Sequence, residues 1–249
     1  MILVLGGTSD SLAICDELNK DVNKSYILSV TTEYGKDLAS IYSKNIILGK
    51  LTKDDMVAFI KENNIETIID ATHPYAVEVS KNAIECSKIT NIDYIRYERK
   101  SLIEDITYKN IFVVDDIDEA CEIANEKGNT IFIGTGSKNL NQYIEKVPNK
   151  KLIARVLPTS EVLISCEKLG LNGDNIIAMK GPFSQCLNEE TYKQYKIDLV
   201  ITKESGVAGG FLEKVLACEK LNIPVVIIRR EKINYPSVIH DIKQITLVL

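Results

Sequence analysis

The chain alternates short, continuous apolar runs with amphipathic segments over nearly its whole length. Apolar runs of four or five residues between turns are typical of strands that are covered on both faces of a sheet. Segments with an apolar residue every three or four positions are typical of helices with one buried face. Strands that alternate with helices in this way predict parallel pairing through right-handed crossovers, which is the α/β class.

The pattern predicts the position of each element. Strands are expected at residues 1–5, 26–30, 46–48, 67–71, 94–97, 111–114, 130–133, 152–156, 176–179, 199–202 and 225–228, with a short edge strand at 245–249. Helices are expected at residues 11–19, 52–63, 74–90, 117–126, 140–144, 160–169, 189–195 and 211–221. Thr52 is an expected N-cap, and Pro74 suits the first turn of a helix. About ten strands are many for one small open sheet, so two sheets of about five strands are expected.

The polar stretch at 100–110 is the predicted boundary between the two sheets, because it is charged and lacks apolar periodicity. It separates an N-terminal domain, 1–103, from a C-terminal domain, 104–249. The segments ILVLGGTSDSL and TIFIGTGSKNL resemble each other, through duplication or through convergence on one local geometry. The expected fold is two Rossmann-like domains, each a mainly parallel sheet flanked by helices, with a ligand cleft between them.

Composition restricts the partners of such a fold. The formal net charge of −5 argues against an overall nucleic-acid binder. No apolar run is long enough to span a membrane and no basic leader opens the chain, so a cytoplasmic protein is expected. The six cysteines lack metal-binding spacing, so no metal site is expected and the thiols are interpreted as buried in a reducing compartment.

Glycine-rich turns follow several predicted strands. Ligands of open parallel sheets bind beyond the carboxyl ends of the strands, where glycines let backbone N–H groups approach a phosphate. GGTS and GTGS fit this use, although a tight turn without a ligand is the alternative for each. The candidate cofactor-binding residues are Gly6, Gly7, Thr8, Ser9, Thr31, Gly134, Thr135, Gly136, Ser137, Lys203, Ser205, Gly206 and Gly210.

The arginines point to the charge of the ligand. The chain has 25 lysines but only five arginines, and all five lie at or just after the carboxyl end of a predicted strand. Arginine clamps carboxylates and phosphates with two hydrogen bonds at once. This placement favours a ligand with several negative charges, and pairing with nearby Asp or Glu is the alternative. The five are Arg96, Arg99, Arg155, Arg229 and Arg230.

Two further patterns bear on catalysis. His73 follows a predicted strand and precedes Pro74, which keeps it out of helical geometry, so it is a candidate donor of a hydrogen bond or a proton. His240 has no motif around it and is interpreted as a surface residue. Tyr192 and Lys196 have the spacing of the catalytic pair of short-chain dehydrogenases, but they lie on a predicted surface helix far from a matching glycine turn.

Together, the strand-end motifs resemble those of the precorrin-6A reductase family of cobalamin biosynthesis. The matching stretches span nearly the whole chain and include DATHPYA, YIRYER, LIARVLP, KGPFS and ITKESG. The resemblance implies hydride transfer from NADPH to the precorrin-6A or cobalt-precorrin-6A macrocycle, with both molecules in the cleft between the domains. The chain departs from the family at Lys180, where Gln is usual, and at Arg230, where Pro is usual.

The residues and the resemblance together assign roles at the ligand edge. The expected substrate-binding residues, which would meet the macrocycle and its carboxylates, are Thr72, Arg96, Arg99, Arg155, Lys180, Ser184 and Arg229. His73 and Tyr75 are the candidate proton donors. Thr31 suits the 2′-phosphate of NADPH, whereas Glu33 would oppose it. The chain is expected to act as a monomer or a weak homo-oligomer.

Two alternatives stay open at this point. A non-catalytic dinucleotide-binding redox sensor would use the glycine turns and give the arginines no role, so replacing Arg96 and Arg155 with Ala would leave its binding intact. A short-chain dehydrogenase acting on a sugar or an alcohol would need Tyr192 and Lys196 beside the ligand, so a fully active Tyr192→Phe variant would exclude it.

Overall fold

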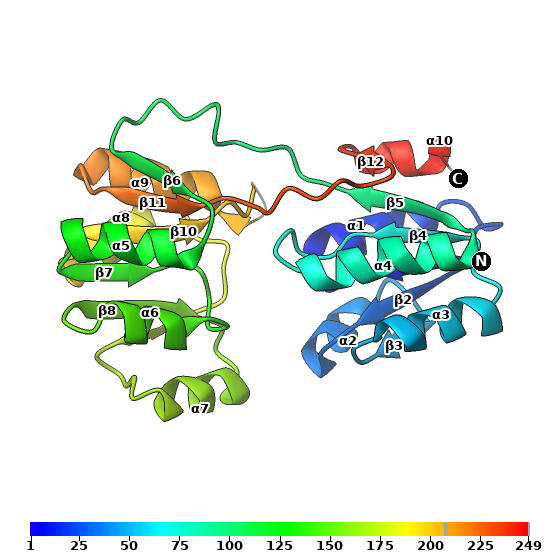
Figure 1. Cartoon of the computed structure of the whole chain (residues 1–249), viewed down its shortest axis with the longest axis horizontal. Coiled ribbons are helices and arrows are strands. Elements are labelled where there is room, and N and C mark those ends of the chain that lie inside the picture. Colours follow the sequence, from blue (N-terminus) through cyan, green and yellow to red (C-terminus); the bar gives the residue numbers. More distant parts are fainter. Residues whose placement is uncertain (207–208, 249) are drawn as a thin grey trace. The chain divides into compact units, whose positions relative to one another are not determined.

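A computed structural model describes residues 1–206 and 209–248 of the chain, in two compact units (Figure 1). Unit 1 comprises Met1–Lys100 together with the residues from Glu231 onward, and unit 2 comprises Ser101–Arg230. Each unit is built on its own parallel sheet, which confirms the predicted α/β class with two Rossmann-like sheets. None of the described helices combines the length and the apolarity that a membrane crossing requires.

The sheet of unit 1 has the order β12-β5-β4-β1-β2-β3, and all its strand pairs are parallel. Its strands are β1 (Ile2–Leu5), β2 (Tyr26–Val30), β3 (Ile46–Leu48), β4 (Thr67–Asp70), β5 (Asp93–Tyr97) and β12 (Val238–Ile239). The register places Leu5 beside Asp70 and Asp70 beside Arg96. The carboxyl ends of three neighbouring strands therefore finish level at one edge.

Helices cover both faces of this sheet. They are α1 (Ser9–Leu18), α2 (Glu33–Ala39), α3 (Lys53–Glu62), α4 (Val77–Thr90), the short 3-10 turn η2 (Ile242–Gln244) and α10 (Ile245–Val248). On β1, Ile2 and Val4 pack into the core that α1, α2 and α10 cover, whereas Leu3 and Leu5 pack into the core under α3 and α4. Continuous apolar sequence in β1 is thus explained by burial on both faces.

The sheet of unit 2 has the order β6-β11-β10-β7-β8-β9, again with parallel pairs. Its strands are β6 (Ile111–Val114), β7 (Thr130–Ile133), β8 (Lys151–Val156), β9 (Ile176–Ala178), β10 (Leu199–Lys203) and β11 (Val225–Ile228). Its helices are α5 (Ile117–Lys127), α6 (Leu140–Lys146), α7 (Ser160–Lys168), α8 (Gln185–Gln194) and α9 (Phe211–Leu221). One of its cores joins Phe132 of β7 to Tyr192 of α8 and Phe211 of α9.

The two sheets share one topology over five of their six strands, all but the edge strands β12 and β6. In each, three consecutive strands run outward from the centre in one direction, and the next two run outward on the other side. The direction reverses between β1 and β4 in unit 1 and between β7 and β10 in unit 2. Ligands of open α/β sheets bind at such a reversal, beyond the carboxyl ends of the strands. Both predicted glycine turns, after β1 and after β7, lie at this position.

The C-terminal segment differs from the sequence-based expectation in two ways. The edge strand expected at 245–249 is wrong, because Ile245–Val248 form helix α10, while residue 249 lies outside the described residues. Ile245 is buried against unit 1 whereas Leu247 and Val248 are exposed. The segment was also expected to belong with the second half, yet β12 pairs with β5 of unit 1 (Figure 1). A two-residue strand has no pattern that could identify its sheet.

One helix was missed, and α4 and α8 begin at other residues than expected, α8 at Gln185 instead of residue 189. The sequence did not predict α2, where Thr32 is the N-cap and its hydroxyl accepts a hydrogen bond from Gly35 N at 3.0 Å. The helix expected from Pro74 begins instead at Val77. Helix α2 buries only Ala39, so its apolar face was too narrow to detect.

Candidate functional site

The glycine turn after β1 is fixed tightly to both neighbouring strands. Gly6 N donates to Ser29 O at 2.8 Å, and a Cβ at Gly6 would lie 2.7 Å from Leu28 Cδ1. Gly7 has a φ of 97°, a conformation that L residues rarely adopt. Thr8 Oγ1 accepts a hydrogen bond from Ser11 N at 3.1 Å and donates one to Ala71 O at 2.8 Å. The turn thus presents the N-terminus of α1, which starts at Ser9, at the carboxyl edge.

A buried carboxylate organises the next strand ends of unit 1. Asp70 is fully buried at the end of β4 and accepts hydrogen bonds from four side chains. Thr72 Oγ1, Tyr94 Oη and Arg96 Nη1 each donate at 2.7 Å, and Ser80 Oγ donates at 2.6 Å. Burial, together with the Asp70 charge, holds the pKa of Tyr94 well above its usual value. Asp70 therefore joins β4, β5 and α4 at one point.

The arginines of unit 1 are paired with carboxylates. Arg96 is only 1% exposed, bonds Asp70, and also donates from Nε to Glu98 Oε2 at 2.9 Å. Arg99 forms an ion pair with Asp10, which lies in the first turn of α1. In this conformation both guanidinium groups are committed to acidic groups of the same unit. A role in binding substrate carboxylates remains a prediction for both, and for Arg96 it requires displacement of an internal partner.

The candidate proton donors lie in the loop between β4 and α4. His73 is exposed, and its Nδ1 accepts a hydrogen bond from Tyr75 N at 3.3 Å. The His73 and Tyr75 rings are 5.7 Å apart between centroids. Thr72, at the base of this loop, is held by Asp70 through both its N–H and its hydroxyl group. Thr31 is exposed between β2 and the Thr32 cap of α2.

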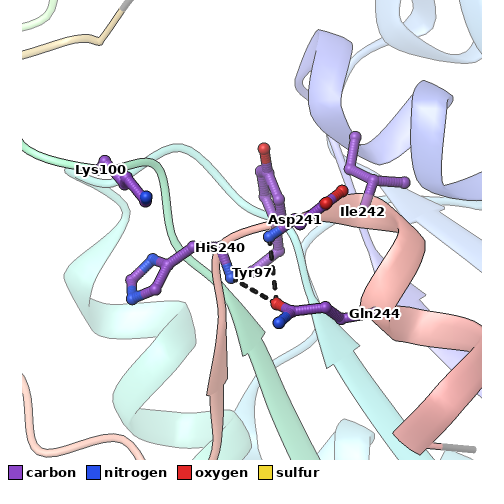
Figure 2. Close-up of a pocket in the computed structure, with 6 residues that line it drawn as sticks. All are labelled: Tyr97, Lys100, His240, Asp241, Ile242 and Gln244. Carbon is purple, nitrogen blue, oxygen red and sulfur yellow. Dashed lines mark hydrogen bonds between the residues drawn. The ribbon is translucent and has the colours of Figure 1, made fainter.

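Unit 1 also has a broad surface hollow of about 540 Å³ near the ends of β5 and β12 (Figure 2). Tyr97, Lys100 and His240 line it together with the Asp241–Gln244 turn. His240 is exposed as expected, and its Nδ1 lies 2.7 Å from Glu98 O. Gln244 Oε1 accepts the backbone N–H groups of His240 and Asp241. The polar groups of this turn are therefore largely used in holding the C-terminal segment to β5.

The glycine turn after β7 also bonds a neighbouring strand and also contains a glycine with a positive φ, but the strand is β10, which corresponds to β4 and not to β2. Gly134 N donates to Ile201 O at 2.8 Å, and Gly136 has a φ of 86°. Thr135 and Ser137 are half-buried on either side of Gly136. The following helix, α6, begins only at Leu140 and has no side-chain cap. The turn after β7 is therefore less closely joined to its helix than the turn after β1.

Arg155 lies at the end of β8 in surroundings unlike those of Arg96. Its side chain is 7% exposed, and its guanidinium carbon lies 3.8 Å from the centroid of the Phe183 ring and 4.9 Å from that of Phe132. Nη1 donates to Asn188 Oδ1 at 2.8 Å. Burial lowers the pKa of Arg155, and within the described residues it forms no ion pair with a carboxylate.

Lys214 of α9 is a second buried cation in unit 2. It is 7% exposed, and Nζ donates to Gly209 O at 3.2 Å. Burial, followed by the nearby Arg155 charge, lowers the pKa of Lys214 to about 8. Glu213 acts in the opposite direction but does not form an ion pair with Lys214 in the described part of the chain. The positive charges of Arg155 and Lys214 therefore repel each other inside unit 2.

The loops around this pair come from two of the predicted motifs. Gly210, with a φ of 61°, is the N-cap of α9, and a Cβ there would lie 3.6 Å from Phe183 N. Ser205 Oγ bonds Gly209 O at 3.3 Å, and Gly206 has a φ of 72°. KGPFS and the glycine loop after β10 therefore meet beside Arg155. Residues 207 and 208 of that glycine loop lie outside the described residues.

The remaining predicted residues are spread over the edge of unit 2. Lys203, at the end of β10, is half-buried, and burial lowers its pKa with a further contribution from Lys138. Ser184 is the N-cap of α8, and its hydroxyl accepts a hydrogen bond from Leu187 N at 3.2 Å. Lys180 is exposed before it. Arg229 forms an ion pair with Asp115 at 2.9 Å and is 41% exposed.

Sequence reasoning missed Lys214, although the sequence contains a signal for it. On α9 the buried positions are Phe211, Lys214, Val215, Ala217 and Cys218, which form one helical face. A lysine in the apolar stripe of an otherwise amphipathic helix marks a buried charge. No group of three or more potential metal ligands occurs within residues 1–206 and 209–248.

Comparisons with known proteins identify the family and the fold of the chain. The family model described as Precorrin-6x reductase CbiJ/CobK matches residues 1–249. The cobalt-precorrin-6A reductases of Priestia megaterium and Methanocaldococcus jannaschii are 39% and 40% identical, over 100% and 98% of this chain and 98% and 96% of theirs. A solved structure, "CobK precorrin-6A reductase", superposes with a TM-score of 0.82 at 20% identity, over 99% of this chain and 95% of that one, which shows the same fold. The chain belongs to the precorrin-6x reductase family.

Proposed function

We propose that this protein is a precorrin-6A reductase, which reduces the precorrin-6A or cobalt-precorrin-6A macrocycle to its dihydro product by hydride transfer from NADPH. The observation that carries the proposal is the family match over residues 1–249, together with relatives of that activity at about 40% identity. The reaction would form part of cobalamin biosynthesis. A cytoplasmic location and a monomeric or weakly associating state accompany the proposal.

The glycine turns suit a phosphate-bearing cofactor. At Gly6 there is no room for a side chain, and Gly7 and Gly136 hold conformations that leave backbone N–H groups uncovered by a Cβ. Both turns lie where the strand order reverses. The residues that would hold NADPH are the cofactor-binding set given above, and when bound its nicotinamide would supply the hydride. The preference for NADPH over NADH is part of the proposal.

The chain's own task in this reaction is binding and orientation. Cationic groups at the carboxyl edges would bind the carboxylates of the macrocycle and stabilise the negative charge that develops on the conjugated ring. Because His73 Nδ1 accepts the Tyr75 amide, the proton of a neutral His73 ring would lie on Nε2. His73 Nε2 or Tyr75 Oη would donate a proton to the reduced ring.

The two alternatives have less support. The short-chain dehydrogenase requires an accessible Tyr192, yet this side chain is 1% exposed inside the core of unit 2. Lys196 lies beyond the end of α8, with a φ of 53°. Helix α8 has an exposed face, as expected, but Tyr192 lies on its buried face, where the Tyr192 and Phe132 rings pack edge-on with their centroids 5.0 Å apart. The redox-sensor hypothesis assigns no role to the buried Arg155.

The test is the reaction itself. Purified protein with NADPH and cobalt-precorrin-6A or precorrin-6A is expected to change the visible spectrum of the macrocycle as its conjugation shortens, with equivalent consumption of NADPH. NADH in place of NADPH tests the cofactor preference. An unchanged spectrum with both authentic macrocycles and both cofactors would end the proposal.

A further inference from the structure

Unit 2 contains two buried positive charges and no carboxylate paired with either, among the residues described. Arg155 and Lys214 are each 7% exposed, and the charge of Arg155 contributes to the lowered pKa of Lys214. A buried cation without a partner is costly, and two of like sign near each other cost more. An anion bound between the two side chains would offset this cost.

We propose that Arg155 and Lys214 together form a binding site for one anionic oxygen group of a ligand, a phosphate or a carboxylate. The geometry of unit 2 brings the two side chains together through Phe183, whose ring stacks on Arg155 and whose backbone N would lie 3.6 Å from a Cβ at Gly210, next to the Gly209 carbonyl that Lys214 bonds. Only the identity of the ligand rests on the proposed function. The new element is Lys214, whose side chain comes from the interior face of α9 rather than from a strand end.

The surroundings of Arg155 orient it for such a contact. Phe183 and Phe132 both lie against the guanidinium, and Asn188, which is fully buried, accepts from Nη1. Asn188 is itself fixed, because its Nδ2 donates to Ser184 O at 3.1 Å. The remaining guanidinium donors make no hydrogen bond within the described residues, so they are available to a planar or tetrahedral oxyanion.

Lys214 has a matching arrangement. Its single hydrogen bond, to Gly209 O, uses one of the three ammonium donors. The charged or titratable groups that act on it are Arg155 from β8, and Glu213 and Cys218 from its own helix. An anion between Arg155 and Lys214 would restore the charged form of the lysine, so binding above pH 8 is coupled to proton uptake.

Two parts of the proposed reactants carry the required chemistry. The cofactor NADPH contributes phosphates, and the macrocycle contributes carboxylates. The two sources are separable, because NAD⁺ lacks the 2′-phosphate of NADP⁺, and uroporphyrin is a flat carboxylated ring without a nucleotide. Inorganic phosphate is the simplest probe, because its binding does not depend on whether the site holds the cofactor or the macrocycle.

The experiment uses the full chain and three variants. Lys214→Met and Arg155→Met remove one charge each and keep a similar apolar stem, and Lys168→Met, at an exposed lysine at the end of α7 in the same unit, is the control. Circular dichroism and thermal unfolding verify that each variant folds. Calorimetric titrations with inorganic phosphate, NADP⁺, NAD⁺ and uroporphyrin give affinities, and titrations at pH 8.5 in buffers of different ionisation enthalpy give the protons taken up.

We expect each charge removal to weaken the binding of phosphate and of one of the larger ligands by about tenfold or more, with the affinities of Lys168→Met unchanged. Loss confined to NADP⁺, relative to NAD⁺, assigns the site to the 2′-phosphate; equal loss for both nucleotides assigns it to the diphosphate. Loss for uroporphyrin alone assigns it to a substrate carboxylate. Proton uptake is expected with the wild-type chain and not with Lys214→Met.

Folded variants that bind all four probes within twofold of the wild-type chain would overturn the site. A wild-type chain that binds none of the four probes would overturn it too. A chain that binds phosphate through Lys214 but never reduces precorrin-6A would keep the site and reject the proposed function, so the two failures are distinguishable.

Discussion

At the carboxyl edge of unit 1, the buried Arg96 is bonded to Asp70 and Glu98, and Arg99 to Asp10. At the carboxyl edge of unit 2, the buried Arg155 faces two aromatic rings and the amide of Asn188 instead. The five strands around the reversal have the same order in both sheets, so topology does not cause the difference. The difference lies in the immediate surroundings of each guanidinium, because the strand-end carboxylates Asp115 and Glu204 of unit 2 pair with Arg229 and Arg230 rather than with Arg155.

This comparison separates two uses of a buried arginine. A guanidinium whose charge is neutralised internally fixes the strands and loops around it, and a ligand would have to compete with its partner. A guanidinium held by rings and an amide keeps its charge uncompensated and favours an anion from outside. Unit 1 therefore resembles a rigid support for the His73 loop, and unit 2 resembles an anion site.

The largest effect is expected at Asp70 in unit 1, whose carboxylate offsets the charge of a buried arginine. Asp70→Asn removes the carboxylate that accepts from Thr72, Ser80, Tyr94 and Arg96, and it leaves a buried positive charge that only Glu98 partly offsets. The free energy of unfolding is expected to fall by about 3–5 kcal/mol, measured by urea denaturation. Glu85→Gln, at an exposed ion pair with Lys53, is the control and should have little effect. A loss below about 1 kcal/mol at Asp70 would remove the contrast between the edges.

In unit 2 the replacement of the buried Lys214 is expected to raise the free energy of unfolding instead of lowering it. The pKa of Lys214 is about 8 in the folded chain against 10.5 in the unfolded chain, so between these values the unfolded chain binds more protons and stability rises with pH. Below pH 8 the full penalty applies, and Lys214→Met is expected to stabilise the ligand-free protein by about 2–3 kcal/mol at pH 7.

The gain from Lys214→Met should shrink as the pH rises from 8 toward 10.5, which urea denaturation across that range would measure. Lys168→Met, at an exposed lysine of α7, is the control and should leave the free energy of unfolding nearly unchanged across that range. Destabilisation by Lys214→Met at every pH would mean that the lysine supports the fold rather than an external anion.

The glycine turns allow a finer comparison of the two edges. Gly6→Ala places a Cβ 2.7 Å from Leu28 Cδ1, whereas at Gly134 the nearest atom, Ile201 O, would be 3.3 Å away. Gly6→Ala is expected to cost roughly 1–3 kcal/mol of unfolding free energy, and Gly134→Ala less. Gly173→Ala, with nothing within 4 Å, is the neutral control in thermal unfolding. Equal costs at Gly6 and Gly134 would contradict the tighter packing of the first turn.

The smallest expected effect concerns the helix caps. Thr8→Val removes both the cap of α1 and the bond to Ala71 O, whereas Thr159→Val removes only the cap of α7, where Val162 N lies 3.4 Å from the hydroxyl. About 1 kcal/mol is expected for Thr8, and less for Thr159, from urea denaturation. A larger cost at Thr159 would reverse the ranking of the two edges.

Much of the fold followed from pattern alone. Continuous apolar runs identified the buried strands, because a strand covered on both faces has no polar side to expose. Glycines in GGTS and GTGS identified the strand-helix turns, because positive φ angles and close strand contact exclude most other residues there. The motif ITKESG also identified, as a candidate anion site, the start of the loop that lies beside Arg155. Helix α2 and strand β12 escaped detection, since each buries too little surface to leave a pattern.

What the sequence by itself determined is the class of the fold, the place of its strand ends and the concentration of arginine there. Only the tertiary structure decided which of these arginines is neutralised from within, because Asp70 and Arg96 are 26 positions apart and become neighbours only through strand register. The structure also added Lys214: its place in the apolar stripe of α9 was a signal in the sequence, but only the packing of α9 shows that the lysine is buried.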